Sequence, residues 1–279
     1  MSFTRDIADY PEGIVLAVDK PWRWTSADVI RKIKYAAIRH FGKKNLKVGH
    51  AGTLDPLATG VLLVCIGNAC KRAQELQDHD KEYIARIRLG ATTPSYDLEK
   101  EVDRRFPYEH ITREAVEAAL PAFLGEQEQV APLFSAKSVD GVRAYELARK
   151  LYKAGQTDAI DAAALQTLHR SRIVISELEL LDFIPAGGDG YGVRGGQAPR
   201  TPYPSPSSRI NVADTSALGL PEAVIRIACS KGTYIRAFAR DLGEALGSGA
   251  HLGGLIRSRS GAYLIEDALA VDQVLALLQ

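Results

Sequence analysis

The chain has 279 residues, a formal net charge of +1, and a composition in which 46% of the residues are hydrophobic and 25% are charged. This length and balance are typical of a globular protein with a buried core, and they exclude a disordered or fibrous chain. No apolar run reaches the roughly 18 residues that a membrane span needs. The polar, acidic N-terminus lacks the pattern of a secretory signal. We therefore expect a cytoplasmic protein that does not enter a membrane.

The three cysteines, Cys65, Cys70 and Cys229, are a sparse and odd-numbered set. Such a set is typical of a reducing compartment and predicts no disulfide framework. Cys65 and Cys70 are too far apart for a CxxC pair, and Cys65 lies in an apolar run. We therefore expect no metal site at these residues.

Positive charge is concentrated in residues 31–50, which contain Lys and Arg but no acid. A run of this kind can bind phosphate backbones. It can equally form a solvated helix face and loop, and the run by itself leaves both interpretations open.

Apolar residues recur along the chain with two periods, one typical of strands and the other of helices. We expect strands at residues 13–21, 61–67, 82–90, 171–184 and 223–230. We expect helices at residues 27–41 (capped by Thr25 or Ser26), 69–77 (capped by Asn68), 113–125, 145–155 and 233–247. This order mixes hairpin-like and helix-connected strands, which predicts an α/β fold on a mixed sheet.

Residues 185–219 differ from the rest, because they are rich in Gly, Pro and Ser and offer little to bury. This composition predicts a flexible segment at the surface. Since strands are expected on both sides of it, an insertion is favoured over a domain linker.

A glycine-rich loop at residues 49–60 precedes the expected strand at 61–67. Its glycines permit tight turns and the close approach of another chain, and Pro56 stiffens the loop just after Asp55. A carboxylate on a stiff loop before a buried strand suits catalysis. Alternatively, Asp55 only accepts hydrogen bonds within its own loop, as in an Asx-turn, and the loop alone favours that second interpretation.

The segment from Gly49 to Lys71 resembles the catalytic motif of the TruB family of tRNA pseudouridine synthases. The matching residues are Gly49, His50, Gly52, Leu54, Asp55, Pro56, Ala58 and Gly60. Other segments resemble the family in the same order: VDKPWRWTS, KEYIARIRLG, CSKGTYIRAFARDLGEALG and HLGGLIRSRSGAY. The segment 129–150 resembles the loop and helix with which the family grips RNA.

This resemblance implies a role for each of three catalytic residues. Asp55 is the expected nucleophile in the isomerisation of uridine to pseudouridine. Tyr83 is expected to stack on the flipped uracil and to assist proton transfer, and Arg236 to pair with the catalytic aspartate. The alternatives are an ordinary core tyrosine and an arginine bound only to solvent.

The resemblance also implies substrate-binding roles for residues near the motif. His50 is expected to stack in the disrupted RNA loop. Lys20 is expected to support the wall of the site, or else to be a solvated lysine at a strand end. The remaining residues expected to contact substrate are Gly52, Thr53 and Leu54.

The fold implied is an α/β (α+β) pseudouridine-synthase fold, with a mixed, mostly antiparallel sheet flanked by helices and loops. We expect a single catalytic domain over residues 1–279, an RNA-gripping insertion at 124–155, the flexible insertion at 185–219, and no separate C-terminal domain. Two departures from the family pattern, Ala131 and Ser138, fall in the gripping segment.

The expected partner is the T-arm of tRNA, and the expected position of modification is RNA position 55. We expect the protein to act as a monomer, without a metal, a cofactor or an obligatory protein partner. One alternative is a guide-RNA-dependent synthase acting on ribosomal RNA. The other is an RNA-binding or tRNA-folding protein whose catalysis is secondary.

Overall fold

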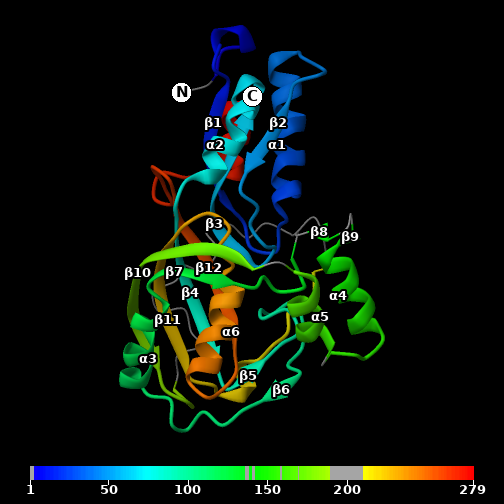
Figure 1. Ribbon diagram of the computed structural model, residues 1–279. Helices are drawn as coiled ribbons and strands as arrows, with labels where there is room; N and C mark the ends of the chain where they lie inside the picture. Colours follow the sequence, from blue (N-terminus) through cyan, green and yellow to red (C-terminus); the bar gives the residue numbers. More distant parts are fainter. Residues whose placement is uncertain (1–2, 136–137, 140–141, 158, 169, 189–209) are drawn as a thin grey trace. The chain divides into compact units, whose positions relative to one another are not determined.

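The computed structural model describes residues 3–135, 138–139, 142–157, 159–168, 170–188 and 210–279 (Figure 1). They form two compact units. The first holds the described residues of Met1–Tyr83, Ile210 and Leu255–Gln279, and the second those of Ile84–Gly192 and Asn211–Gly254. The single domain expected from the sequence stays a prediction.

The first unit contains a sheet in the order β14-β1-β3-β12, with β2 beside β3 and β13 beside β12. Its strands are β1 (Ile14–Lys20), β2 (Val48–Ala51), β3 (Ala58–Ile66), β13 (Tyr263–Leu264) and β14 (Leu269–Ala270), with parts of β4 (Lys81–Leu89) and β12 (Ala250–Ser260). Residues 61–66 of β3 are 0% exposed, which confirms the buried strand expected there. β1 pairs with β3 in antiparallel register, from Ile14 opposite Ile66 to Lys20 opposite Gly60.

The helices of the first unit are η1 (Ile7–Asp9), α1 (Ser26–Phe41), η2 (Gly67–Arg72), α2 (Ala73–Asp78) and α7 (Val271–Leu277). The expected cap of α1 is confirmed at Thr25, whose side chain forms a capping box with Asp28. The expected cap at Asn68 is wrong. A 3-10 helix occupies 67–72, and the Asn68 amide donates to the Pro11 carbonyl.

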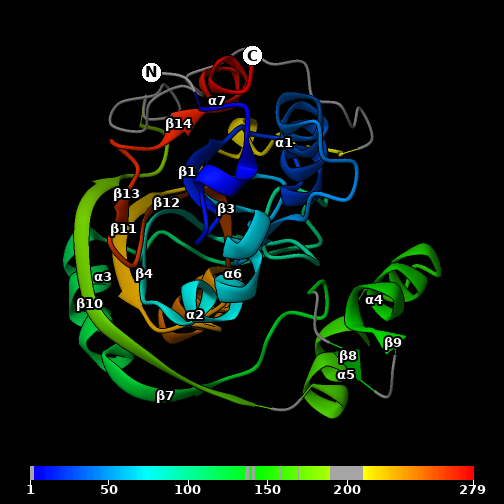
Figure 2. The same cartoon turned by 90° about the horizontal axis from the view of Figure 1, so that it is seen from above.

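The second unit has the strand order β4-β11-β10-β7, in which β10 pairs antiparallel with both β11 and β7. Its strands include β7 (Gly125–Gln129), β10 (Ser171–Ile184) and β11 (Glu222–Cys229), with the short pairs β5 (Ala91–Thr92)–β6 (Arg104–Arg105) and β8 (Ser138–Val139)–β9 (Val142–Arg143). β10 is long and curved (Figure 2). Register shifts at 175/177 and 180/182 accompany the curvature, as bulges do.

The helices of the second unit are α3 (Arg113–Ala119), η3 (Leu120–Phe123), α4 (Ala144–Lys153), α5 (Ala159–Thr167), η4 (Ser216–Leu218) and α6 (Ile235–Ala245). α4 and α5 lie side by side (Figures 1 and 2), and share a small core with Val130 and Leu133. This core stabilises the segment expected to grip RNA.

The segment 185–219 connects the neighbouring strands β10 and β11. Its flexibility was expected, but residues 189–209 lie outside the described part of the chain. Near its C-terminal end, Ala213 and Thr215 are buried, and the Ala213 amide donates to the Leu98 carbonyl at 2.8 Å.

The two units together give a mixed α/β structure whose sheet pairs are mainly antiparallel, which confirms the expected fold class. Among the helices of the described residues, none is long and apolar enough to cross a membrane.

Candidate active site

Asp55 lies in the loop between β2 and β3, and its side chain is partly buried. Ser26, the first residue of α1, clamps this loop: its hydroxyl accepts from the Leu54 amide at 3.0 Å and donates to the Leu54 carbonyl at 3.1 Å. On the other side, the Ala58 amide donates to the Asp55 carbonyl at 3.1 Å. The backbone is therefore held on both sides of the carboxylate, as a preorganised site requires.

Lys20 ends β1 beneath this loop and is 0% exposed, so it is not a solvated lysine. Its ammonium donates to the carbonyls of Pro21, Trp24 and Pro56 at 3.1, 2.6 and 3.2 Å. Burial lowers the pKa of Lys20 to about 7, and the charge of Asp55 acts against that change. Lys20 thus ties its own turn to the residue that follows Asp55.

Arg257 of β12 was not expected as a site residue, and it is 1% exposed. Its Nε donates to the Val61 carbonyl at 2.6 Å and its Nη2 to the Gly52 carbonyl at 3.0 Å. Its positive charge also helps to lower the pKa of Lys20 and of His50. A buried guanidinium therefore supports the loop from the strand side. Its one signal in the sequence is its place in the segment HLGGLIRSRSGAY, which resembles the family but indicated no role for this arginine.

Gly60 allows this close packing of β3 against β12. Its φ is +99°, and a Cβ at this position would lie 2.3 Å from the backbone oxygen of Arg257. Only glycine tolerates both conditions.

The other expected residues of the first unit differ in exposure. Tyr83 is 9% exposed on β4, and His50 is partly buried on β2. Burial holds the pKa of His50 below its ordinary value, which favours a neutral ring for stacking. Thr53 is exposed, whereas Leu54 is 3% exposed and packs in the core.

Arg236 lies in the second unit, at the start of α6, and is 6% exposed. Its Nη1 donates to the carbonyls of Ser95 and Phe134 at 3.2 and 2.9 Å, and its Nε lies 3.7 Å from Oδ2 of Asp97. The alternative of an arginine bound only to solvent is excluded by this burial.

Asp97, the partner of Arg236, is itself held in place. Its Oδ1 accepts from the Ser95 hydroxyl at 2.6 Å and from the Glu99 amide at 2.9 Å. The carboxylate thus faces Arg236 with a fixed orientation.

Two non-glycine residues in the described part of the chain have positive φ, Arg23 at +63° and Tyr96 at +56°. Arg23 donates its amide to the Pro56 carbonyl at 2.9 Å, next to Asp55. Tyr96 lies between Ser95 and Asp97, the contacts of Arg236. Residues with unfavourable backbone conformations are often found at functional sites. Here one lies next to the Asp55 loop and the other next to the contacts of Arg236.

The expected pairing of Asp55 with Arg236 joins residues of different units and stays a prediction. Within the described residues, no group of three or more His, Cys, Asp or Glu side chains is arranged to hold a metal ion.

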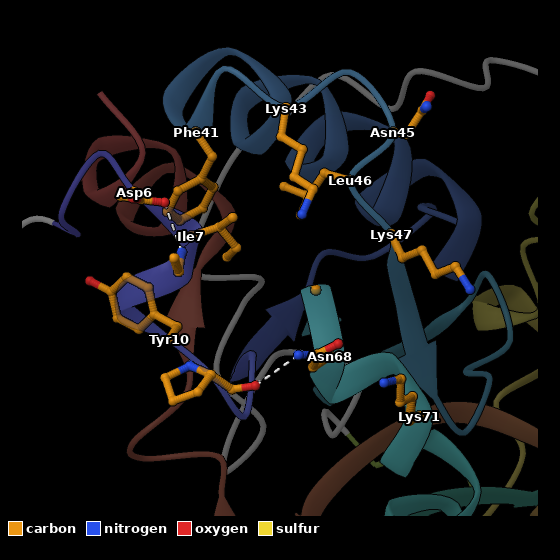
Figure 3. A pocket seen from close by; sticks show the side chains of 13 residues that line it. Asp6, Ile7, Tyr10, Phe41, Lys43, Asn45, Leu46, Lys47, Asn68 and Lys71 are labelled. Atoms are coloured by element: carbon orange, nitrogen blue, oxygen red, sulfur yellow. Dashed lines mark hydrogen bonds between the residues drawn. The ribbon is translucent and has the colours of Figure 1, made fainter.

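A cavity of about 530 Å³ lies elsewhere in the first unit, between η1, the end of α1 and η2 (Figure 3). Lys43, Lys47 and Lys71 are among its lining residues, and Figure 3 shows Lys43 extending into the space between η1 and η2. Two of these lysines belong to the basic run at 31–50.

Residues 39–182 match the family described as TruB family pseudouridylate synthase (N terminal domain). Fold and family match together define an RNA-base isomerase of the pseudouridylate synthase class. The chain belongs to the TruB family of these enzymes, which confirms the resemblance found in its motifs.

Two relatives illustrate the similarity. A protein of Phocaeicola vulgatus named tRNA pseudouridine synthase B is 50% identical over 264 residues, covering 95% of this chain and 92% of the relative. One of the same name from Thermus thermophilus is 40% identical over 269 residues, covering 92% of this chain and 76% of the relative.

Solved structures with the same fold include a Cbf5-Nop10-Gar1 complex, with a TM-score of 0.60, 22% identity, and coverage of 97% of this chain and 56% of that chain. A second is an H/ACA RNP bound to a substrate RNA containing 2′-deoxyuridine. Its TM-score is 0.57 and its sequence identity 20%, and the match covers 99% of this chain and 57% of that chain. The chain therefore spans a little over half of those chains, and at such identity the likeness concerns the fold alone.

Proposed function

We propose that this chain isomerises a uridine of tRNA to pseudouridine, in the T-loop at RNA position 55, with Asp55 as the nucleophile. The observation that carries the proposal is the rigid loop that presents Asp55, clamped by Ser26 and supported by Lys20 and Arg257. Relatives named tRNA pseudouridine synthase B, one of them 50% identical to this chain, support the choice of tRNA.

The reaction exchanges one bond of the ribose for another. The bond between the ribose and a ring nitrogen of uracil breaks, the detached base turns, and a ring carbon bonds to the ribose instead. That carbon loses a proton and the nitrogen gains one, so the product is an isomer. Asp55 supplies the nucleophile for this exchange without a metal or organic cofactor.

Arg236 orients the catalytic carboxylate in this proposal, and its own orientation comes from Asp97 and two carbonyls. Tyr83 stacks on the uracil and assists proton transfer. His50 stacks in the loop that the base has left. These roles follow the family motif.

Removing a base from a folded RNA loop costs a few kcal/mol of stacking and pairing. Stacking on Tyr83 and His50 offsets part of this cost, and phosphate contacts made by the basic run offset a further part. The lysines that line the cavity of the first unit are suited to such contacts (Figure 3). The segment 124–155, with its own small core, is the proposed arm that grips the T-arm.

The test is to incubate the purified chain with an unmodified tRNA transcript and with its isolated T-arm hairpin, and then to map pseudouridine by position. We expect modification of both RNAs at position 55 and none in a transcript with cytidine there. Modification at another position would contradict the T-loop assignment. A requirement for an added guide RNA would favour the guide-dependent alternative, and binding without turnover would favour the tRNA-folding alternative.

A further inference from the structure

The turn Pro21–Trp24 is tied to the Asp55 loop by several bonds. The buried ammonium of Lys20 joins the carbonyls of Pro21 and Trp24 to that of Pro56. The Arg23 amide donates to the same Pro56 carbonyl at 2.9 Å. Since these contacts bridge the two segments directly, the turn holds a fixed position beside the proposed nucleophile.

This turn carries two tryptophans with opposite environments. Trp24 is 2% exposed and belongs to the core, whereas Trp22 is 39% exposed. A single exposed apolar side chain is normal at a protein surface. The case for Trp22 therefore rests on its fixed place beside the Asp55 loop and on its contact with Arg23.

Arg23 is the residue that accompanies Trp22. Its guanidinium carbon lies 5.6 Å from the centre of the Trp22 ring, and its Nη2 donates to the Ile210 carbonyl at 2.9 Å. Its φ of +63° is a conformation in which glycine would be unstrained. Arg23 thus adopts a strained backbone conformation while its side chain makes both contacts, and these contacts orient the Trp22 ring.

We propose that Trp22, held by Arg23, is a stacking platform for an unpaired nucleobase of the substrate RNA next to the flipped uridine. This inference rests on the proposed function, because flipping one base leaves its neighbours without a stacking partner. An exposed aromatic ring with a neighbouring guanidinium suits the π-face of any base. The site therefore takes a nucleobase without selecting its sequence.

The first experiment compares Trp22→Ala and Trp22→Phe with the unchanged chain on an unmodified tRNA transcript. Loss of one base–aromatic stack corresponds to roughly a 5- to 100-fold rise in KM or Kd. We expect such a rise for Trp22→Ala, with kcat within about twofold, and recovery of most of the affinity in Trp22→Phe. A matched control is Leu181→Ala, because Leu181 of β10 is 43% exposed and lies outside the segments proposed to bind RNA; its KM should not change.

The second experiment uses the fact that the chain has only two tryptophans. Titration with the transcript should quench tryptophan fluorescence in the unchanged chain. In Trp22→Phe, which retains the buried Trp24, the quenching should be lost. This measurement needs no catalysis and is independent of the kinetic constants.

Two results would overturn the inference: an unchanged KM in a folded Trp22→Ala variant, or equal quenching in Trp22→Phe and the unchanged chain. A rise in KM for Leu181→Ala equal to that of Trp22→Ala would also count against a specific site. If the unchanged chain forms no pseudouridine, the proposed function fails as well. If it does form pseudouridine and only the Trp22 effects are missing, the stacking site alone is wrong.

Discussion

The orientation of Arg236 depends on a small number of neighbouring atoms. Two carbonyls accept from its Nη1, and Asp97 faces its Nε. The Ser95 hydroxyl in turn donates to Asp97 at 2.6 Å. In the proposed function, Ser95 therefore acts through Asp97 as a positioning residue for Arg236, without a role in the chemistry itself.

We expect Ser95→Ala to lower kcat on the order of tenfold with little change in KM, because a hydrogen bond to a charged group is lost. Ser95→Thr, which keeps the hydroxyl, should restore most of the rate. The matched control is Ser248→Ala, which removes a buried hydroxyl that donates to the Pro107 carbonyl at 2.8 Å. Single-turnover rates, corrected for the folded fraction, measure the effect. Equal losses of kcat in Ser95→Ala and Ser248→Ala would indicate a merely structural role.

At the scale of secondary structure, the Asp55 loop depends on the contact between β3 and β12. The strands pair in parallel at three positions, from Leu255 opposite Ala58 to Arg257 opposite Gly60. The same Arg257 then donates to Val61 and Gly52. The strand contact and the support of the loop are therefore linked through one residue.

We expect Gly60→Ala to lower the free energy of unfolding by roughly 3 kcal/mol or more, because the added Cβ meets backbone atoms and the φ is strained. Gly42→Ala is the control: its φ is +62°, but no atom lies within 4 Å of an added Cβ. It should cost only about 1–2 kcal/mol. Urea denaturation of both variants measures the difference. Equal losses in the free energy of unfolding would show that the close packing of Gly60 against β12 does not contribute.

The sequence predicted the strands best where apolar residues dominate or alternate. The strand expected at 82–90 matches β4 within one residue at each end, and the helix expected at 27–41 matches α1 within one residue. The strand expected at 61–67 is β3, which begins three residues earlier and ends one residue earlier. The helix expected at 113–125 changes to a 3-10 helix at Leu120, where Pro121 cannot donate an amide to an α-helical bond. β12 was not expected, because Gly253 and Gly254 interrupt the apolar pattern by which a strand is recognised. In the structure, the side chains of Arg88 and Arg86 of β4 lie against these two glycines.

The site could be predicted only in part, for a physical reason. Asp55, Lys20 and His50 lie in or near a contiguous motif, whereas Arg257 and Ser26 support the loop from distant parts of the chain. A single arginine in a strand or a serine at a helix start carries no local signal of such a contact. Likewise, no pattern in the sequence indicated the positive φ of Arg23 and Tyr96.

At the scale of the whole molecule, buried polar networks link stability to pH. His251 is 0% exposed, its Nδ1 bonds the Ala91 carbonyl at 2.8 Å, and its Nε2 lies 3.4 Å from the Thr215 hydroxyl. Arg88 donates to the same hydroxyl, so that hydroxyl is free to donate to Nε2 of a neutral ring. Burial lowers the pKa of His251 to about 4.

Because the unfolded chain has a histidine pKa near 6.5, it binds more protons than the folded chain between about pH 4 and 6.5. Stability should therefore fall as the pH falls through this window, by roughly 3 kcal/mol at most from this group. Urea denaturation at several pH values measures the loss, and the NMR titration of His251 identifies its source. A His251 ring that titrates near pH 6.5 in the folded protein would contradict this explanation.

In the proposed function, Asp55 performs the chemistry and the surrounding loop holds it in place. The most direct test is Asp55→Asn, measured for pseudouridine formation and for transcript binding. Asp214→Asn is the control, since the Asp214 carboxylate merely accepts from the Ser216 amide at 2.9 Å. We predict that Asp55→Asn abolishes pseudouridine formation while fold and RNA affinity remain near those of the unchanged chain, and that Asp214→Asn is active. Near-normal turnover by folded Asp55→Asn would contradict the claim.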